Sequence, residues 1–570
     1  MIRIFKERPT YNKDLLKKDS IASLTLLVMI IPQGMAYALL AGVPAVMGLY
    51  AATIPMLVYA LLGSSRHLSV GPVAITSLLV FTAVSAYAPA DTGEYIQYVI
   101  VLAAMVGLIQ LLLGFGKAGF IVKFIPHSVF SAYTSAVAII IGLSQLNHLL
   151  GVTSEGNLRA HTILYNLGSQ WNSINGYTVL LGSLSLVLIL WLKERWPRLP
   201  APLIALCLAI AAVVFLGLDD AGVAIVGQIP AGLPAFTLPE VTGSMIVNLL
   251  PMAIVIALMG FMESLSIGRA ISKKEHYAVR PNQELKALGM SNLVGSFFQG
   301  FPVNGSFSRT AVNHEAGGRT KAASVLTAGG VLVVLLFFTS LFYYLPNAVL
   351  AAIIISAVYK LVDIQQAKHL FDVRPLEGWV WVLTFLSTLI VGIQWGIIIG
   401  AVFTLLFIIR QSMQPNIAEL GYLSEQGEFR DRRRFPEALL FRNGMLMRID
   451  SNIHFANYSY VEEHIRELAG KRTDMYWMVI DMSGVNDIDT SSVEQLEEFL
   501  LQLQQETGMF FYLANVKGYV RDTIAKAEWK KDLQQRVSYQ SIEHILEQMN
   551  VRLPSPDKKK TAKGPNDFMI

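Results

Sequence analysis

The chain has 570 residues, of which 53% are hydrophobic and only 15% are charged, and its mean hydropathy is +0.49. This composition excludes a soluble globular protein and indicates a polytopic membrane protein, for which the net charge of +4 says little by itself. A single cysteine, Cys207, excludes an intrachain disulfide and a cysteine-based metal site, and we expect no bound metal.

The first part of the chain is an N-terminal segment followed by membrane helices. Residues 1–18 are basic and polar and lack a small-residue cleavage site, so we expect a retained cytoplasmic segment. From residue 19 to residue 411, long stretches lack Asp, Glu, Lys and Arg, each of which costs roughly 2.5–3.5 kcal/mol at a bilayer centre. The longest stretches hold two crossings each and divide near residues 41–44, 345–347 and 394–396, which gives about fourteen segments in the lipid bilayer.

Basic residues are distributed unevenly between the two sets of loops. An even number of segments places both termini on one side, and the loops on the opposite side carry only Arg159. The loops on the N-terminal side carry Arg66, Lys117, Lys123, Lys193, Arg195, Arg198, Arg269, Lys273, Lys274, Arg280, Lys286, Arg319, Lys321, Lys360, Lys368 and Arg374. This asymmetry predicts cytoplasmic N- and C-termini.

Two short segments depart from plain hydrophobic spans. In residues 67–79, HLSVGPVAITSLL, the pair Gly71-Pro72 stands where a helix would start, since proline is favoured in a first helical turn. The other short segment lies within residues 300–320. The segment at residues 67–79 is third from the N-terminus, and the segment within residues 300–320 is third in the second set of seven segments. This placement predicts inverted repeats whose half-helices meet at the bilayer midplane.

Residues 300–320, GFPVNGSFSRTAVNHEAGGRT, combine glycines, hydroxyls and Arg309 within an apolar region. A lipid-facing helix cannot have this composition, because charges and backbone breaks are tolerated at membrane depth only around a cavity or within protein. Residues 304–306, Asn-Gly-Ser, are suited to starting a helix whose free N–H groups and dipole attract an anion. The alternative is an ordinary loop and helix with Arg309 extended to a headgroup.

After Arg410 the composition changes to that of a soluble domain. We expect a polar linker at residues 412–436, an α/β domain at residues 437–550 and a disordered tail at residues 551–570. Within the domain, buried strands such as MYWMVIDMS alternate with amphipathic helices such as SSVEQLEEFLLQLQQETG.

Four stretches together form a specific pattern: IPQGMAYALLAGVPAVMGLYAA (31–52), GSSRHLSVGPVAITSLL (63–79), NQELKALGMSNLVGSFFQGFPVNGSFSRTAVNHEAGGRT (282–320) and DMSGVNDIDTSS (481–492). In these stretches the chain resembles the sulfate permease (SulP) anion transporters, to which prestin and pendrin also belong. The resemblance implies a polytopic α-helical fold of about 14 segments in two inverted 7-segment repeats. It also implies a mobile core domain moving against a gate domain, a homodimer, and a C-terminal cytoplasmic STAS domain.

The resemblance also implies which residues bind the anion. The positions that match the family's site are Gln33, Tyr37, Gly71, Pro72, Val73, Phe307, Ser308 and Arg309. Gln33 and Ser308 can donate hydrogen bonds, and Arg309 supplies a permanent positive charge. Ordinary helix packing is the alternative for Tyr37 and Phe307, and a structural ion pair is the alternative for Arg309.

Glu263 is the only acid in the interior of a predicted span. A carboxylate beside an anion site repels the substrate unless it is protonated, so we hypothesise that Glu263 couples inward proton flow to uptake. The alternative is that Glu263 is held in a fixed bridge to Arg309 or to a backbone donor. Sodium-coupled members of the family have Asp at this position and Thr a turn later, where this chain has Ile267, so sodium coupling is less favoured.

In the STAS domain, DIDTSS resembles the phosphorylated loop of anti-sigma-factor antagonists, with Thr490 and Ser491 as candidate regulatory phosphorylation sites. A phosphate there would lie at a helix start. The alternative is that Thr490 is a plain helix N-cap.

The sequence therefore predicts a secondary active transporter of the bacterial inner (plasma) membrane, not an enzyme, with proton-coupled sulfate uptake as the first hypothesis. Bicarbonate, C4-dicarboxylate or nitrate transport and chloride exchange are alternatives, as are an anion channel and a membrane-anchored STAS sensor. We expect no cofactor apart from the coupling proton and no nucleic acid; a cytoplasmic protein that binds the STAS domain is a possible partner.

Overall fold

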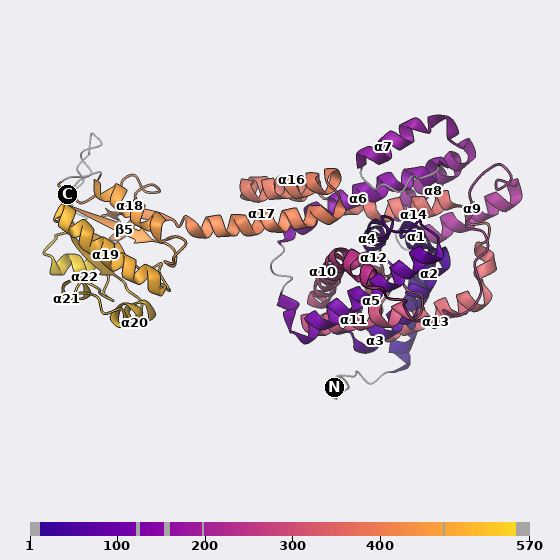
Figure 1. Cartoon of the computed structure of the whole chain (residues 1–570), viewed down its shortest axis with the longest axis horizontal. Coiled ribbons are helices and arrows are strands. Elements are labelled where there is room, and N and C mark those ends of the chain that lie inside the picture. Colours follow the sequence, from indigo (N-terminus) through magenta and orange to yellow (C-terminus); the bar gives the residue numbers. More distant parts are fainter. Residues whose placement is uncertain (1–11, 121–125, 153–159, 197–198, 471–473, 554–570) are drawn as a thin grey trace. The chain divides into compact units, whose positions relative to one another are not determined.

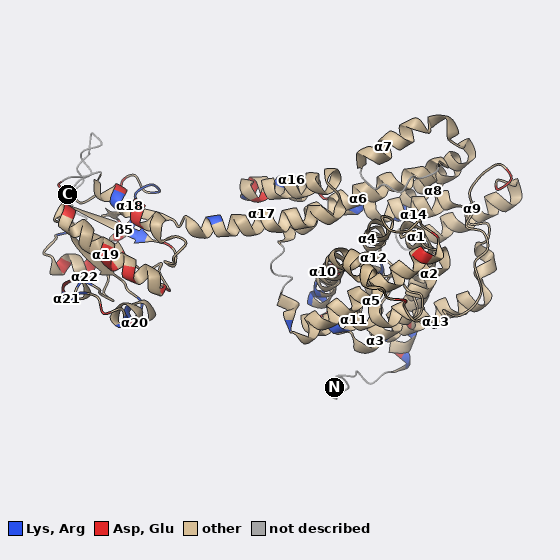
Figure 2. Ribbon diagram, in the orientation of Figure 1, with Lys and Arg blue, Asp and Glu red and all other residues tan. Residues whose placement is uncertain are grey.

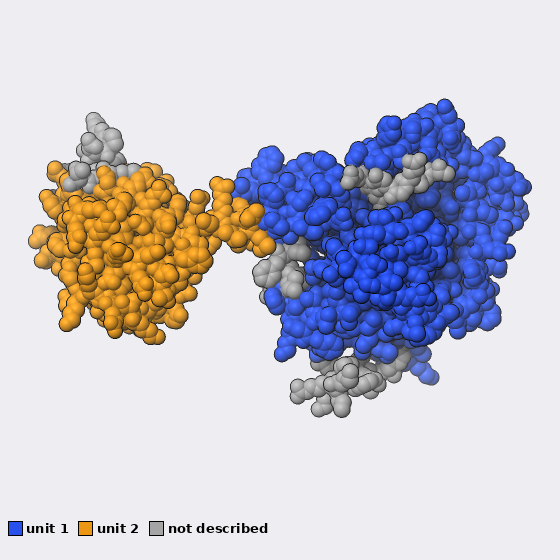
Figure 3. Space-filling view, viewed as in Figure 1, with its two compact units in different colours: residues 1–404 blue, residues 405–570 orange. Residues whose placement is uncertain are grey.

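The computed structural model describes residues 12–120, 126–152, 160–196, 199–470 and 474–553. It divides into two compact units, residues 1–404 and residues 405–570 (Figure 3). Residues 1–11 of the predicted N-terminal segment, residues 554–570 of the predicted tail, and Lys123, Arg159 and Arg198 lie outside the described residues.

The first unit is helical (Figure 1). Its elements are α1 (Lys13–Leu40), α2 (Ala45–Ala51), α3 (Ile54–Leu62), β1 (Val70–Gly71), α4 (Ala74–Val84), α5 (Gly93–Phe115), α6 (His127–Leu150), α7 (Ala160–Ser169), η3 (Trp171–Ser173), α8 (Gly176–Arg195), α9 (Ala201–Leu216), α10 (Gly243–Lys274), α11 (Pro281–Ser296), β2 (Asn304–Gly305), α12 (Phe307–Glu315), α13 (Ala322–Phe337), η4 (Thr339–Phe342), α14 (Asn347–Val358), η5 (Tyr359–Leu361), α15 (Ile364–Val373), α16 (Pro375–Ile390) and α17 (Ile393–Met413). Within the described residues, 8 helices are long and apolar enough to cross a membrane, and four shorter apolar helices accompany them. Together with α11 and α12 they supply the predicted set of membrane segments.

Two of the three predicted breaks fall where the sequence predicts them, because α1 ends at Leu40, α2 begins at Ala45, and α14 begins at Asn347. The break predicted near residues 394–396 is displaced, because α16 ends at Ile390 and α17 already begins at Ile393, so those residues belong to α17. Residues 13–18, which were predicted as part of the cytoplasmic N-terminal segment, are helical and form the first turns of α1. Asn12 caps the helix by accepting the N–H of Leu15 at 2.9 Å, so the helix can begin in a polar stretch.

The membrane helices pack as two groups. In the core group, α1 packs on α2, α12 and α13, while α5 packs on α10 and α11 and α3 packs on α11 and α13. In the gate group, α14 packs on α6 and α8, α6 packs on α16, and α8 packs on α9. The groups meet chiefly where α1 touches α9 and α14 and where α4 touches α6. The two groups are named after the predicted core and gate, and one continuous hydrophobic core joins them.

Apart from Glu263 in the interior of α10, the charged residues of the membrane helices lie mostly toward their ends. Figure 2 shows long tan ribbons in the first unit, with blue residues at the ends of α10 and α11 and near the start of α1. Ionised residues are excluded from lipid-facing helix centres by their insertion cost, and this accounts for the pattern.

The second unit is an α/β domain around a mixed sheet. Its elements are β3 (Ile417–Leu423), β4 (Glu428–Asp431), β5 (Gly444–Ile449), α18 (Tyr458–Gly470), β6 (Trp477–Asp481), α19 (Thr490–Thr507), β7 (Phe510–Ala514), α20 (Gly518–Lys526), α21 (Lys531–Gln534) and α22 (Ile542–Gln548). The strand order is β4-β3-β5-β6-β7, with β5, β6 and β7 parallel and β3 antiparallel to both neighbours. α18, α19 and α20 share a hydrophobic core with one face of the sheet, and α22 covers the other face.

The predicted linker at residues 412–436 is wrong for residues 417–431, which form β3 and β4. β3 is a central strand whose residues are nearly all buried, so it lacks the alternation of polar and apolar residues that marks a half-exposed strand. β4 is a short charged strand at the sheet edge, where charge discourages pairing with other chains. The α/β domain therefore begins near residue 417.

Candidate functional site

Two short strands bring the starts of α4 and α12 together. β1 pairs antiparallel with β2, so that Val70 lies opposite Gly305 and Gly71 opposite Asn304. α4 follows its N-cap Val73, and α12 follows its N-cap Ser306. Because the paired strands run in opposite directions, the two helices leave the pairing in opposite directions and their N-terminal ends face a shared region. Both predicted half-helices are therefore present, with their electropositive ends together beside α1 (Figure 1).

Hydrogen bonds, two of them to hydroxyl groups, hold the pairing of β1 with β2 in place; we call this pairing the crossing. The N–H of Ser69 donates to Oγ1 of Thr310 at 3.1 Å, and the N–H of Ser306 donates to the carbonyl of Ser69 at 3.0 Å. The N–H of Gly305 donates to Oγ of Ser264 on α10 at 2.8 Å. These bonds satisfy backbone groups that no lipid or regular helix could satisfy at this depth.

Asn304 connects the crossing to two neighbouring helices. Its side-chain amide donates to Oγ1 of Thr76 on α4 at 2.6 Å. It also presses against the backbone of α10 at Gly260, where an added methyl group would lie 2.0 Å from Oδ1 of Asn304. Only glycine permits this approach, so the crossing is fixed relative to the helix that carries Glu263.

Arg309 lies in the first turn of α12 and is fully buried. Its Nη1 donates to Oε1 of Gln33 on α1 at 3.4 Å, and a methyl group on Gly71 would lie 3.3 Å from its Nη2. Among the described residues, its Nε and Nη2 have no hydrogen-bond partner. Burial contradicts the alternative in which Arg309 extends to a headgroup, and the unpartnered donors give no support to a structural ion pair.

Tyr37 and Glu263 face the same guanidinium. Tyr37 is buried on α1 one turn from Gln33, and both Tyr37 and Glu263 lie within electrostatic range of Arg309. The side chain of Glu263 is only half-buried, whereas its neighbour Ser264 is fully buried against β2. The acid therefore stands at the margin of the region into which the half-helices point.

The remaining predicted residues divide into a buried set and an exposed set. Gly71, Pro72 and Val73 are buried at the start of α4. Phe307 is 62% exposed and Ser308 is also exposed, although both belong to the first turn of α12. Ordinary helix packing therefore does not describe Phe307, whose ring borders open space.

Sequence reasoning missed several groups that support the site. Ser264 and Thr76, which hold β2, and the buried pair of Asn292 and Gln110 carry no signal beyond being polar residues in apolar helices. The Asn292 amide donates to Oε1 of Gln110 at 3.0 Å and accepts the N–H of Val303 at 2.7 Å. Hydroxyl and amide side chains at these positions could have been flagged, because buried polar groups are nearly always hydrogen-bonded.

A second acid of the membrane unit is more deeply buried than Glu263. Glu284, at the start of α11, is fully buried and accepts hydrogen bonds from the hydroxyl of Tyr59 at 2.6 Å and the N–H of Ser64 at 2.6 Å. Its donors satisfy it, so it is a structural group. Arg309 and the half-buried Glu263 differ from Glu284, because the described residues leave part of their hydrogen-bonding capacity unused.

In the second unit, the predicted phosphorylation residues lie at the start of α19. Thr490 and Ser491 are exposed, and the N-cap is Asp489, so the reading of Thr490 as the N-cap is wrong. Oδ1 of Asp489 accepts the N–H of Ser492 at 2.8 Å, and Oδ2 accepts the N–H of Phe455 at 2.7 Å. Partial burial opposes ionisation of Asp489, but these donors outweigh it and hold its pKa below the ordinary value.

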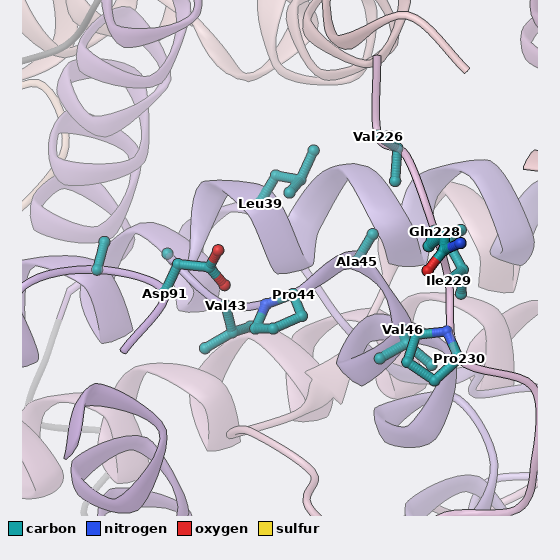
Figure 4. A pocket seen from close by; sticks show the side chains of 12 residues that line it. Leu39, Val43, Pro44, Ala45, Val46, Asp91, Val226, Gln228, Ile229 and Pro230 are labelled. Carbon is teal, nitrogen blue, oxygen red and sulfur yellow. The ribbon is translucent and has the colours of Figure 1, made fainter. Parts of the chain in front are cut away.

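A pocket of about 460 Å³ lies elsewhere in the first unit, at the junction of α1 and α2. Figure 4 shows Asp91 beside Val43 and Pro44 at one end of its lining and Gln228 at the other. The only charged side chain that lines it is acidic, so this pocket is unsuited to hold an anion.

The chain was compared with known proteins. The sequence profile of the sulfate permease family matches residues 16–384, and that of the STAS domain matches residues 436–542. Sulfate transporter 4.1 (chloroplastic) of Arabidopsis thaliana is 36% identical over 530 residues, which cover 90% of this chain and 77% of the relative. The structure of the murine Solute Carrier 26 family member A9 anion transporter in the inward-facing state is similar, with a TM-score of 0.87, 25% identity and coverage of 95% and 92%. The transmembrane domain of the cyanobacterial bicarbonate transporter BicA has a TM-score of 0.60 and 26% identity, and the match covers 68% of this chain and 98% of BicA.

Proposed function

This chain belongs to the sulfate permease family of anion transporters, and from that premise we propose that it takes up sulfate together with protons. The anion would bind between the N-terminal ends of α4 and α12, in contact with Gln33 and Arg309.

The observation that supports this proposal most directly is the state of the Arg309 side chain. A guanidinium removed from water is costly unless its donors are satisfied, yet Nε and Nη2 have no partner within the described part of the chain. An oxyanion supplies the acceptors that are missing. The amide N–H groups at the starts of α4 and α12, and the exposed hydroxyl of Ser308, are additional donors for it.

Charge balance favours coupling to protons. With Glu263 ionised, Arg309 and Glu263 cancel, so a bound sulfate dianion would leave the site with two uncompensated negative charges. Protonation of Glu263 removes one of them. At an effective dielectric near 20, a like charge about 5 Å from the bound anion costs roughly 3 kcal/mol, which corresponds to more than a hundredfold loss of affinity. Ile267, buried one turn after Glu263, supplies no oxygen ligand for sodium.

Transport would proceed by movement of the core group against the gate group. The site lies almost entirely on the core helices α1, α4, α10 and α12, so a rigid displacement of this group carries the anion across the membrane. We place the protein in a bacterial plasma membrane as a homodimer with both termini in the cytoplasm, and assign it no cofactor apart from the proton. Phosphorylation of Thr490 or Ser491, or a protein bound to the STAS domain, would regulate it.

Bicarbonate is the second candidate. The membrane unit resembles the transmembrane domain of a bicarbonate transporter over nearly the full length of that domain. In addition, a bound monoanion would balance the charge of Arg309 when Glu263 is protonated. C4-dicarboxylates, nitrate and chloride exchange remain weaker alternatives.

The experiment is uptake of labelled sulfate into vesicles that contain the purified protein, at external pH 6 and pH 7.5. Unlabelled sulfate, bicarbonate, fumarate, nitrate and chloride serve as competitors. We expect acid-stimulated sulfate uptake that sulfate inhibits best. Binding without flux would identify a sensor, currents independent of the proton gradient would identify a channel, and stronger competition by bicarbonate would transfer the assignment to that anion.

A further inference from the structure

A second pocket, of about 330 Å³, lies on the face of the membrane unit that carries the basic loops. It collects residues from four places in the chain: the start of α1, the segment before β1, the end of α10, and the segment between α12 and α13. The residues that line it are Leu15, Lys18, Arg66, His67, Glu275, Tyr277, Arg319 and Thr320. None of them belongs to the anion site around Arg309.

The lining has an excess of positive charge. Lys18, Arg66 and Arg319 are cations, and Glu275 is the only acid among the lining residues. Glu275 is already engaged, because Arg319 donates to it at 2.7 Å and His314 contacts it at 2.8 Å. Across the described ranges, Lys18 and Arg66 form no salt bridge with an acidic side chain. Two permanent cations therefore face the pocket without a counter-charge from these residues.

The polar groups between these cations are held in place. The Tyr277 hydroxyl lies 3.2 Å from Nδ1 of His67, and the Arg66 guanidinium lies over the Tyr277 ring, 5.2 Å from its centroid. His67 is 2% exposed, and among the described residues its Nε2 makes no hydrogen bond of full geometry, although the backbone of Gly318 lies beside the ring. When Nδ1 accepts from the Tyr277 hydroxyl, Nε2 carries the proton, so the pocket contains a buried ring N–H that is at most weakly bonded.

The Glu275 carboxylate does not serve as the counter-charge for Lys18 and Arg66. Its hydrogen bond with His314 and the nearby charge of Arg319 hold its pKa below the ordinary value, against the opposing effect of partial burial. It therefore stays ionised and bound to Arg319 and His314, and it leaves Lys18, Arg66 and His67 for a ligand.

We propose that this pocket binds a phosphate group, at a regulatory site separate from the transport site. A phosphate offers several strong acceptor oxygens, which match two cations and a ring N–H, and the volume admits the group with part of the molecule that carries it. The source is either the headgroup of an anionic phospholipid or a soluble phosphate. The inference does not depend on which anion the protein transports.

Binding at this site would affect transport through the chain segments that it joins. Lys18 lies on α1, which carries Gln33; Arg66 and His67 precede β1, which leads into α4; and Arg319 follows α12, which carries Arg309. A phosphate bound by Lys18, Arg66 and His67 would join the start of α1 to the segment before β1, beside the segment that follows α12, and would hold two of the three elements of the transport site in one arrangement. Its expected effect is a more stable core group and an altered maximal rate of uptake, with little change in KM for the transported anion.

The test measures phosphate binding to the full-length purified protein through its thermal stability. Inorganic phosphate is titrated in neutral detergent without sulfate, and the Arg309→Gln variant is titrated in parallel to identify any binding of phosphate at the transport site. In a second arm, the protein is placed in phosphatidylcholine vesicles with or without phosphatidic acid. The double variant Lys18→Gln/Arg66→Gln removes the two unpaired cations, and the matched control Lys273→Gln/Lys274→Gln removes two exposed charges of α10 that do not line the pocket.

We expect phosphate or phosphatidic acid to raise the Tm of the wild type and of the control. The double variant should require about a hundredfold more ligand, since each hydrogen bond to a charged group is worth roughly tenfold in affinity. A response to phosphatidic acid alone identifies a lipid site, and a response to inorganic phosphate alone identifies a soluble ligand. The proposal is overturned if neither ligand raises Tm, or if the double variant and the control respond alike.

Discussion

Replacement of Arg309 by glutamine separates a binding role for this side chain from a structural one. The guanidinium is fully buried and makes one hydrogen bond, to Gln33, while two of its donor atoms have no partner in the described part of the chain. If both donors bind the anion, the variant loses two hydrogen bonds to a charged group, each worth roughly 1.5–3 kcal/mol. The sum, about 3–6 kcal/mol, corresponds to roughly a 10²–10⁴-fold weaker affinity for sulfate.

The same change has an opposite effect on the empty protein. A buried guanidinium that lacks acceptors costs several kcal/mol of desolvation, and a neutral amide relieves much of that cost. We therefore expect Arg309→Gln to have the same Tm as the wild type, or a higher one, when no anion is present. Loss of function together with retained or increased stability is typical of a residue kept for binding.

The assay combines sulfate uptake by vesicles with thermal unfolding in detergent, each with and without sulfate. Arg269→Gln is the control, because it removes an exposed arginine of the same membrane unit. The wild type and the control should be stabilised by sulfate, and Arg309→Gln should not be. A wild-type KM in Arg309→Gln would refute a binding role, and a large loss of Tm without sulfate would show that Arg309 serves the fold.

Three further predictions concern other parts of the chain. Glu263→Gln should leave sulfate uptake measurable but abolish its stimulation by an inward proton gradient, and unchanged acid stimulation would exclude Glu263 as the coupling group. Gly71→Ala should raise the KM for sulfate several-fold, because its methyl group would lie 3.3 Å from the Arg309 guanidinium, whereas Gly93→Ala, which meets nothing within 4 Å, should behave as the wild type. The lowered pKa of Asp489 contributes stability above its unfolded pKa of about 4, which is lost as pH falls through the folded value. Hydrogen exchange in the first turn of α19 should therefore accelerate in acid. At neutral pH, Asp489→Ala should lower the free energy of protection of this turn by about 1 kcal/mol relative to the wild type. Equal protection in the wild type and the variant would contradict the capping role.

The positions of the helices were predictable because insertion into lipid penalises charge more strongly than any other local feature of a sequence. The half-helix starts were predictable for a related reason, since Gly71-Pro72 and Asn304-Gly305-Ser306 cannot occur in an ordinary lipid-facing helix. The soluble strands β5, β6 and β7 follow from short runs of buried residues. β3 escaped detection because it lies inside the sheet yet contains Glu419 and Gly421, which give it the composition of a linker.

The contacts of the site were less accessible to physical reasoning. Gln33 and Arg309 are 276 positions apart, and nothing in the local sequence around either residue identifies the other. Their association was expected from the resemblance to a family, not from periodicity or composition. The basic pocket around Arg66 was not predicted at all, because its lining comes from the ends of elements whose residues read, one at a time, as solvated loop charges.

The lengths of α4 and α12 explain why we propose the site where they meet. Helices of 11 and 9 residues extend about 16 Å and 14 Å, so neither crosses a hydrocarbon layer of about 30 Å, but the two together do. Each helix then exposes its first N–H groups at mid-depth, and the two-residue pairing of β1 with β2 satisfies only the groups before those starts. The N–H of Arg309 is capped by Oγ of Ser306 at 3.5 Å, but α4 has no side-chain cap, and Nε and Nη2 of Arg309 have no acceptor among the described residues. These groups form a set of donors in a region that lipid cannot satisfy. An anion is the simplest species that satisfies them all, and because these donors belong to the core group, movement of that group would carry the bound anion with it.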